Sequence, residues 1–156
     1  MAKEIERKFL TVNDDWRIVD PIYYCQGYLN RDKQRTVRVR IAGDKAMLTV
    51  KGLTEGACRD EFEYDIPVDD AKQMLQLCEQ PLIEKNRYLV TYSNMNWEID
   101  EFLGLNQGLI VAEIELESED QTLDVPSWVG EEVTADSRYF NSSLSREPYS
   151  TWANPA

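Results

Sequence analysis

Residues 35–51 read RTVRVRIAGDKAMLTVK and contain the pattern that decides the fold. Charged and apolar side chains alternate on both sides of Gly43-Asp44, a pair that tolerates the positive φ of a tight hairpin turn. In a strand, residues i and i+2 lie on one face, so Arg38 and Arg40 share a face while apolar residues occupy the other. The stretch therefore predicts two hairpin-paired strands with one charged face.

The same alternation recurs in short segments along the chain, separated by Gly, Asn and Asp turns. This arrangement is typical of an antiparallel β-protein. We expect eight strands, which are enough to close a barrel. Their expected ranges are 3–11, 22–31, 35–42, 45–53, 57–66, 83–91, 95–102 and 110–117.

Two segments have helical periodicity instead. Residues 69–78 begin with two acids suited to the first turn of a helix and continue with apolar residues at helical spacing. They predict an amphipathic helix outside the sheet, and a second helix is expected at 136–144. The predicted fold class is mainly β (α+β): a closed eight-stranded antiparallel β-barrel with a few helices packed outside. We expect one domain over residues 1–147 and an irregular tail at 148–156.

The composition argues against several classes of protein. A net charge of −12 disfavours binding to nucleic acid or anionic membranes, which need a basic surface. The first ten residues, MAKEIERKFL, lack the apolar core of a secretory signal, and no later run approaches the ~18 apolar residues of a membrane span. Cys25, Cys58 and Cys78 are odd in number and far apart, so we interpret them as reduced thiols. We expect a cytoplasmic protein with a small-molecule partner, and a homodimer is compatible with the sequence.

Histidine is absent from the chain. Its absence removes the commonest general base and the commonest zinc ligand. Any hydrolysis must therefore activate water in another way. Carboxylates with a hard cation such as Mg²⁺ or Mn²⁺ are the leading candidates.

Seven of the expected strands carry a charged face, and the two signs are segregated. Solvated faces usually mix lysine with glutamate, whereas the strand of Arg38 is mainly basic and those of Glu98 and Glu113 are acidic. Segregation favours a site that binds an anion with some strands and cations with others, rather than the solvated faces of an ordinary sandwich. The seven basic and ten acidic residues give a formal charge of −3, which two divalent cations would change to +1. They are Glu4, Glu6, Lys8, Arg38, Arg40, Lys51, Arg59, Glu61, Glu63, Asp65, Lys85, Arg87, Glu98, Asp100, Glu113, Glu115 and Glu117.

In order and spacing, these residues resemble the CYTH superfamily, also called triphosphate tunnel metalloenzymes, and within it the short bacterial type of inorganic triphosphatase. Glu4-Ile5-Glu6-Arg7-Lys8 matches the N-terminal E-x-E-x-K signature, and the resemblance runs from residue 3 to about 144. The later matches are Arg38-Val39-Arg40, Leu48-Thr49-Val50-Lys51, Arg59 with Glu61 and Glu63, Lys85-Asn86-Arg87-Tyr88, Glu98-Ile99-Asp100, Glu113-Ile114-Glu115, and Glu132-Val133-Thr134 before Arg138-Tyr139.

The resemblance implies a barrel whose hydrophilic, charged lumen holds a triphosphate with two Mg²⁺ or Mn²⁺ ions. The implied metal ligands are Glu4, Glu6, Glu113 and Glu115, followed by Glu61, Glu63, Glu98 and Asp100. The implied phosphate-binding residues are Lys8, Arg38, Arg40, Lys51, Lys85 and Arg87, with Arg138 as a further contact. Arg59 either binds phosphate or pairs with a glutamate, and Tyr28 either reaches the lumen or packs the barrel. Glu4, Glu6 and Lys8 are the implied catalytic group.

The activity implied is hydrolysis of inorganic triphosphate to diphosphate and phosphate by metal-activated water. Alternatives on the same fold are a class IV adenylate cyclase, a thiamine triphosphatase and a noncatalytic polyphosphate- or nucleotide-binding module. The first two must recognise an organic group by stacking, for which Trp16, Trp97, Trp128 and Trp152 are candidate platforms. A lipocalin-like barrel would need an apolar interior, which conflicts with the charged faces.

Overall fold

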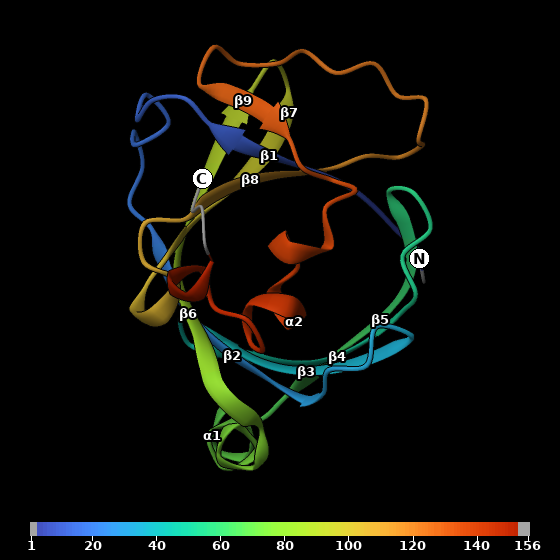
Figure 1. The fold of residues 1–156 in the computed structure, drawn as a ribbon, viewed down its shortest axis with the longest axis vertical. Coiled ribbons are helices and arrows are strands. Elements are labelled where there is room, and N and C mark those ends of the chain that lie inside the picture. The colour runs from blue at the N-terminus through green and yellow to red at the C-terminus, as the bar shows by residue number, and fades with distance from the viewer. Residues whose placement is uncertain (1–2, 153–156) are drawn as a thin grey trace.

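The computed structural model describes residues 3–152, which form a closed β-barrel (Figure 1). The strands are β1 (Lys3–Thr11), β2 (Ile22–Asn30), β3 (Arg35–Ala42), β4 (Lys45–Gly52), β5 (Cys58–Ile66), β6 (Glu79–Tyr92), β7 (Met95–Phe102), β8 (Ile110–Glu115) and β9 (Val129–Glu132). The α-helices are α1 (Val68–Leu77) and α2 (Asn141–Leu144), and 3-10 helices lie at Gly104–Asn106, Ser137–Tyr139 and Tyr149–Thr151.

The barrel closes through β1, which pairs antiparallel with strands on both of its edges. The sheet order is β5-β4-β3-β2-β6-β7-β8-β1-β9, and an additional pairing of Lys3–Ile5 with β5 completes the ring of β1 to β8. The predicted eight-stranded antiparallel barrel is thus confirmed. The short strand β9, which pairs with the far half of β1, was not expected.

Tight turns with left-handed residues set the register of two hairpins. Gly43 has φ of 60° and joins β3 to β4, where Ala42 pairs with Lys45 as the alternation predicted. Ser93 and Asn94, with φ of 52° and 63°, form the turn between β6 and β7. Because strand side chains alternate with a period of two, these registers decide which residues face the lumen.

The main hydrophobic core lies outside the ring of strands. The outward faces of β1, β6, β7 and β8 pack beneath the segments that contain Trp16 and Trp128. On the other side, α1 covers the outer face of β2 to β5 with Ala71 and Leu75, which confirms the first predicted helix and its position. An outer core leaves the interior of the barrel available for charged side chains.

The second expected helix, at 136–144, differs from the prediction. Phe140 has extended backbone (φ −68°, ψ 137°) and separates a 3-10 turn at Ser137–Tyr139 from the single turn α2. Figure 1 shows α2 within the ring of strands rather than outside it. The physical reason is an apolar end of the lumen: Ile83 and Phe102 pack with Leu144 and with C-terminal aromatic residues.

The end of the chain takes part in this packing. Tyr149 is buried in the same cluster as Leu144, and Trp152 contacts it with ring centroids 5.1 Å apart. The expected tail at 148–156 therefore includes a short 3-10 helix, and residues 153–156 lie outside the described part. Within residues 3–152, no helix combines the length and apolar character needed to cross a membrane.

Candidate active site

The resemblance implied seventeen site residues, counting the metal ligands, the phosphate-binding residues, Arg138, Arg59 and Tyr28. Fifteen of them line one cavity inside the barrel, and Asp100 and Arg138 do not. The alternation of each strand turns these side chains toward the inside of the barrel. The register then places Glu6 opposite Glu115, Lys8 opposite Glu113 and Lys51 opposite Glu61. The lining residues are Glu4, Glu6, Lys8, Tyr28, Thr36, Arg38, Arg40, Lys51, Arg59, Glu61, Glu63, Lys85, Arg87, Glu98, Glu113, Glu115, Phe140, Asn141 and Ser142.

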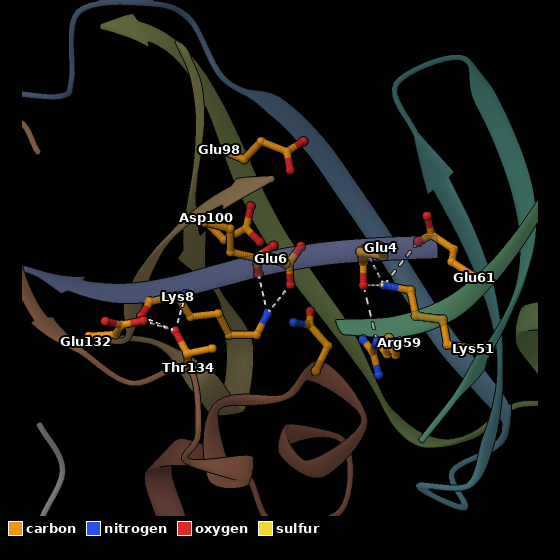
Figure 2. Close-up of polar contacts among 12 residues, drawn as sticks. Glu4, Glu6, Lys8, Lys51, Arg59, Glu61, Glu98, Asp100, Glu132 and Thr134 are labelled. Atoms are coloured by element: carbon orange, nitrogen blue, oxygen red, sulfur yellow. Dashed lines mark hydrogen bonds and ion pairs between the residues drawn. The ribbon is translucent and has the colours of Figure 1, made fainter. Parts of the chain in front are cut away.

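At the start of β1, Glu4 is the shared acceptor of two cations. Lys51 Nζ lies 3.1 and 3.0 Å from its two oxygens, and Arg59 Nε lies 3.2 Å from Oε1 (Figure 2). Burial alone would raise the pKa of Glu4, but the charges of Lys51 and Arg59 lower it to about 2. Arg59 therefore pairs with a glutamate in this structure while it also lines the cavity.

Lys8 bridges two carboxylates in the middle of the lumen. Its Nζ donates to Glu6 Oε1 at 2.8 Å and to Glu113 Oε1 at 3.0 Å. Burial and the charge of Glu113 raise the pKa of Glu6 to about 7, because one lysine cannot neutralise both carboxylates. Figure 2 shows Glu6 and Lys8 projecting from β1 toward the same region, with Thr134 and Glu132 at the strand edge.

Asp100 lies beneath the cavity wall and holds two cations in place. Both Asp100 and Lys85 are fully buried, with Lys85 Nζ 2.7 Å from Oδ2. Arg87 binds the same carboxylate through Nε at 2.7 Å and Nη2 at 2.8 Å, so both oxygens of Asp100 accept from cations. Asp100 is therefore a buried counter-ion of Lys85 and Arg87 that does not line the cavity, and its implied role as a metal ligand stays a prediction.

The basic wall of the lumen contains a hydrogen-bond donor without an acceptor among the described residues. Arg38 Nη2 lies 3.2 Å from Thr49 Oγ1 and 3.4 Å from Glu63, but its buried Nε has no partner within the described residues. Arg40 Nε donates to Gln26 Oε1 at 2.7 Å. A buried guanidinium N–H without an acceptor is costly, so a ligand oxygen at this position would be stabilising.

Arg138 is the second predicted residue that lies elsewhere. It is exposed, binds Asp136 through Nε and Nη2, and stacks on Trp152 at 4.8 Å outside the lumen. It does not line the cavity because the 3-10 turn at Ser137–Tyr139 directs Tyr139, not Arg138, into the core, and its phosphate contact stays a prediction.

Aromatic residues contribute little to the cavity. None of the four tryptophans lines it: Trp16, Trp97 and Trp128 belong to the outer core, and Trp152 packs on Tyr139 and Tyr149. Tyr28 reaches the lumen but is only 4% exposed, so it also packs the barrel wall. The tryptophans are therefore not stacking platforms for a substrate in this cavity.

Sequence reasoning missed several residues of the lumen. Thr36 lies two residues before Arg38 on the same strand face, so the period-two pattern could have identified it. Phe140, Asn141 and Ser142 carry no such signal, because their position depends on how the C-terminal segment folds back into the barrel.

The carboxylates fit a hard divalent cation in chemistry, although they do not form a closed metal cage. Among residues 3–152, no three acidic, cysteine or histidine side chains converge closely enough to hold an ion alone. Mg²⁺ commonly binds through one or two carboxylates and completes its shell with water and phosphate oxygens. Burial and the charges of neighbouring glutamates also raise the pKa of Glu6, Glu61 and Glu115, and a bound cation would favour the ionised form of each.

Comparison with known proteins agrees with the fold. Residues 2–149 match the CYTH domain model. The chain is 49% identical over 151 residues to an inorganic triphosphatase of Acetivibrio thermocellus (96% of this chain, 97% of the relative) and 34% identical over 145 residues to one of Nitrosomonas europaea (90% and 95%). A crystal structure of an inorganic triphosphatase superposes with a TM-score of 0.66 at 32% identity, covering 90% of this chain and 96% of that one. On these matches, this chain belongs to the CYTH domain family.

Proposed function

We propose that this protein hydrolyses inorganic triphosphate to diphosphate and phosphate in its lumen, in a reaction that needs Mg²⁺ or Mn²⁺. The observation that carries the proposal is the gathering of Lys8, Arg38, Arg40, Lys51, Lys85 and Arg87 around one cavity that also holds a cluster of carboxylates. The activity of the relative that is 49% identical supports the same substrate. Three free cysteines agree with the proposed cytoplasmic location.

The basic residues bind and orient the phosphates. Arg38 and Arg40 present planar guanidinium donors from β3, and Lys51 adds a point charge from β4. A phosphate oxygen would supply the acceptor that Arg38 Nε lacks. These fixed cations also stabilise the negative charge that develops on the leaving diphosphate.

The carboxylates that would hold the metal ions are Glu4, Glu6, Glu113 and Glu115, with Glu61, Glu63 and Glu98 acting directly or through water. A bound Mg²⁺ or Mn²⁺ ion supplies charge neutralisation and lowers the pKa of a coordinated water. Lys8 contacts Glu6 and Glu113, and in the proposed reaction it would donate to the reacting phosphate.

The lumen favours an inorganic substrate over an organic triphosphate. Among the described residues that line it, only Tyr28 and Phe140 are aromatic, and the rest are charged, hydroxyl or amide side chains. A cyclase or a thiamine triphosphatase would need an apolar or stacking surface for the organic group. The charged cavity provides many phosphate contacts and little such surface.

The test is a substrate panel of tripolyphosphate, ATP and diphosphate, each with Mg²⁺ and with Mn²⁺, analysed by chromatography. We expect phosphate and diphosphate from tripolyphosphate and no cyclic AMP from ATP. Metal-dependent binding without turnover would instead favour the noncatalytic module.

The metal assignment is tested with Glu115→Gln, which we expect to raise the metal concentration needed for half-maximal turnover. Glu117→Gln is the matched control, because Glu117 is exposed beyond the end of β8 and does not line the cavity. Turnover of Glu115→Gln equal to that of the control at every metal concentration would refute the assignment.

A further inference from the structure

Asn141, the first residue of α2, lies inside the lumen at the end of a chain of hydrogen bonds. Arg40 Nε donates to Gln26 Oε1 at 2.7 Å, and Gln26 Nε2 donates to Asn141 Oδ1 at 2.9 Å. From the other side, Lys85 Nζ also donates to Asn141 Oδ1 at 2.9 Å. Asn141 Oδ1 thus accepts from Lys85 directly and is linked to Arg40 through the amide of Gln26.

The direction of these bonds fixes the orientation of the Asn141 side chain. Arginine and lysine can only donate, so Gln26 must turn its oxygen toward Arg40 and its amino group toward Asn141. Asn141 must then turn Oδ1 toward both donors, which points its own amino group, Nδ2, away from them. Nδ2 makes no hydrogen bond to any of residues 3–152 in this structure, although Asn141 lines the cavity.

The backbone that carries Asn141 is firmly held. Leu144 of the same turn is fully buried among Ile83, Phe102 and Tyr149 at the apolar end of the barrel. Phe140 and Ser142, on either side of Asn141, line the cavity as well. α2 is therefore a fixed floor of the lumen, and the Nδ2 donor has a defined position in it.

Lys85 also has a hydrogen-bond donor to spare near Asn141. Its ammonium group carries three N–H donors, and the two acceptors found for it are Asp100 and Asn141. Within residues 3–152 no third acceptor is found for it, so one N–H donor remains unused. An anionic oxygen at the floor of the lumen could thus receive hydrogen bonds from Lys85 and from Asn141 together.

We propose that Asn141 is a substrate-binding residue whose Nδ2 donates to a phosphate oxygen of the inner end of the triphosphate, beside Lys85 at the floor of the lumen. This assignment rests on the proposed function and adds an uncharged donor from outside the strands to the basic wall. The competing explanation is that Asn141 only fastens α2 to Gln26 and Lys85.

Asn141→Asp separates the two explanations. The carboxylate keeps the acceptor for Gln26 and Lys85, so a role limited to fastening α2 would be preserved or strengthened. It also replaces the Nδ2 donor with a negatively charged oxygen that repels phosphate. We expect the KM for tripolyphosphate to rise tenfold or more with an unchanged or higher Tm. Asn141→Ala, which loses both functions, should show a smaller rise in KM together with a lower Tm.

The matched control is Asn13→Asp, which adds the same charge on an exposed outer loop and keeps the acceptor for the Asp15 amide. It should leave both KM and Tm unchanged. A KM of Asn141→Asp within twofold of the control would overturn the proposal. If Asn141→Asp fails to fold, Asn141→Ala replaces it in the test. A KM of Asn141→Ala equal to that of the control would then refute the proposal.

Binding of tripolyphosphate without metal, measured by calorimetry, keeps this test separate from that of the proposed activity. If the unaltered protein binds tripolyphosphate but does not hydrolyse it, the proposed activity fails while weaker binding by Asn141→Asp still supports the contact. If the unaltered protein hydrolyses it and Asn141→Asp binds it equally well, only the contact fails.

Discussion

Lys51 Nζ lies 3.1 and 3.0 Å from the two oxygens of Glu4, and each side chain is only 9% exposed. Arg59 reaches the same carboxylate. Two cations of the lumen, Lys51 and Arg59, are therefore paired with one of its own glutamates in this structure. Under the proposed function, a triphosphate that binds these cations must exchange the pairs.

The first prediction concerns Glu4→Gln. The change removes the carboxylate that Lys51 and Arg59 share and leaves Lys51 with Glu61 Oε2 at 3.3 Å, so the free energy of unfolding should fall by about 1–3 kcal/mol. Tripolyphosphate without metal supplies the missing anion, and it should raise the Tm of the variant more than that of the unaltered protein. Differential scanning calorimetry with and without tripolyphosphate measures both effects. Equal ligand-induced shifts would contradict the exchange of partners.

The second prediction compares the contributions to stability of Asp100 and Glu98, which lie on the same face of β7. Asp100→Asn removes the buried counter-ion of Lys85 and Arg87, so it should lower the free energy of unfolding by about 3–5 kcal/mol. Glu98 is 36% exposed at its side chain, and Glu98→Gln should cost less than about 1 kcal/mol. Urea denaturation of metal-free protein makes the comparison. Similar losses for both variants would show that Asp100 is not the structural member of the pair.

The third prediction concerns the closed end of the barrel. Leu144 is fully buried, and Leu144→Ala should lower the free energy of unfolding by about 2–5 kcal/mol through the cavity it creates. Leu77→Ala is the control, because Leu77 is 76% exposed at the end of α1 and its truncation should change stability by about 0.5 kcal/mol or less. A loss for Leu144→Ala no larger than that of the control would mean that α2 does not close the lumen.

The fourth prediction is a pH dependence of substrate binding. Burial and the charges of Arg87 and Arg40 lower the pKa of Lys85 to about 7. Above that pH the free protein holds Lys85 increasingly neutral, whereas a bound polyanion favours the charged form. Binding should therefore take up a proton, and affinity should weaken by up to about tenfold per pH unit above 7.

Calorimetry of tripolyphosphate binding in buffers of different ionisation enthalpy measures this proton uptake. Lys85→Gln is neutral at every pH, so it should bind more weakly and lose the contribution of Lys85 to the uptake. The same uptake in both proteins would assign the titration to the ligand and not to Lys85.

The sequence by itself determined the barrel and most of its lumen. Alternation with a period of two places Glu4, Glu6 and Lys8 on one face wherever β1 lies, and Gly43 specifies a hairpin turn through its positive φ. Both signals depend only on covalent geometry and neighbouring residues. For this reason fifteen of the seventeen implied site residues, all but Asp100 and Arg138, reach the cavity.

Only the tertiary structure decided which charges are available to a ligand. Asp100 carries the same pattern signal as Glu98, yet its oxygens are occupied by Lys85 and Arg87, because pairing depends on the distance between β6 and β7 side chains in space. Asn141 enters the lumen because Leu144 is buried with residues distant in sequence, such as Ile83. Local periodicity fixes the face on which a side chain lies, while the partners of that side chain are set by long-range packing.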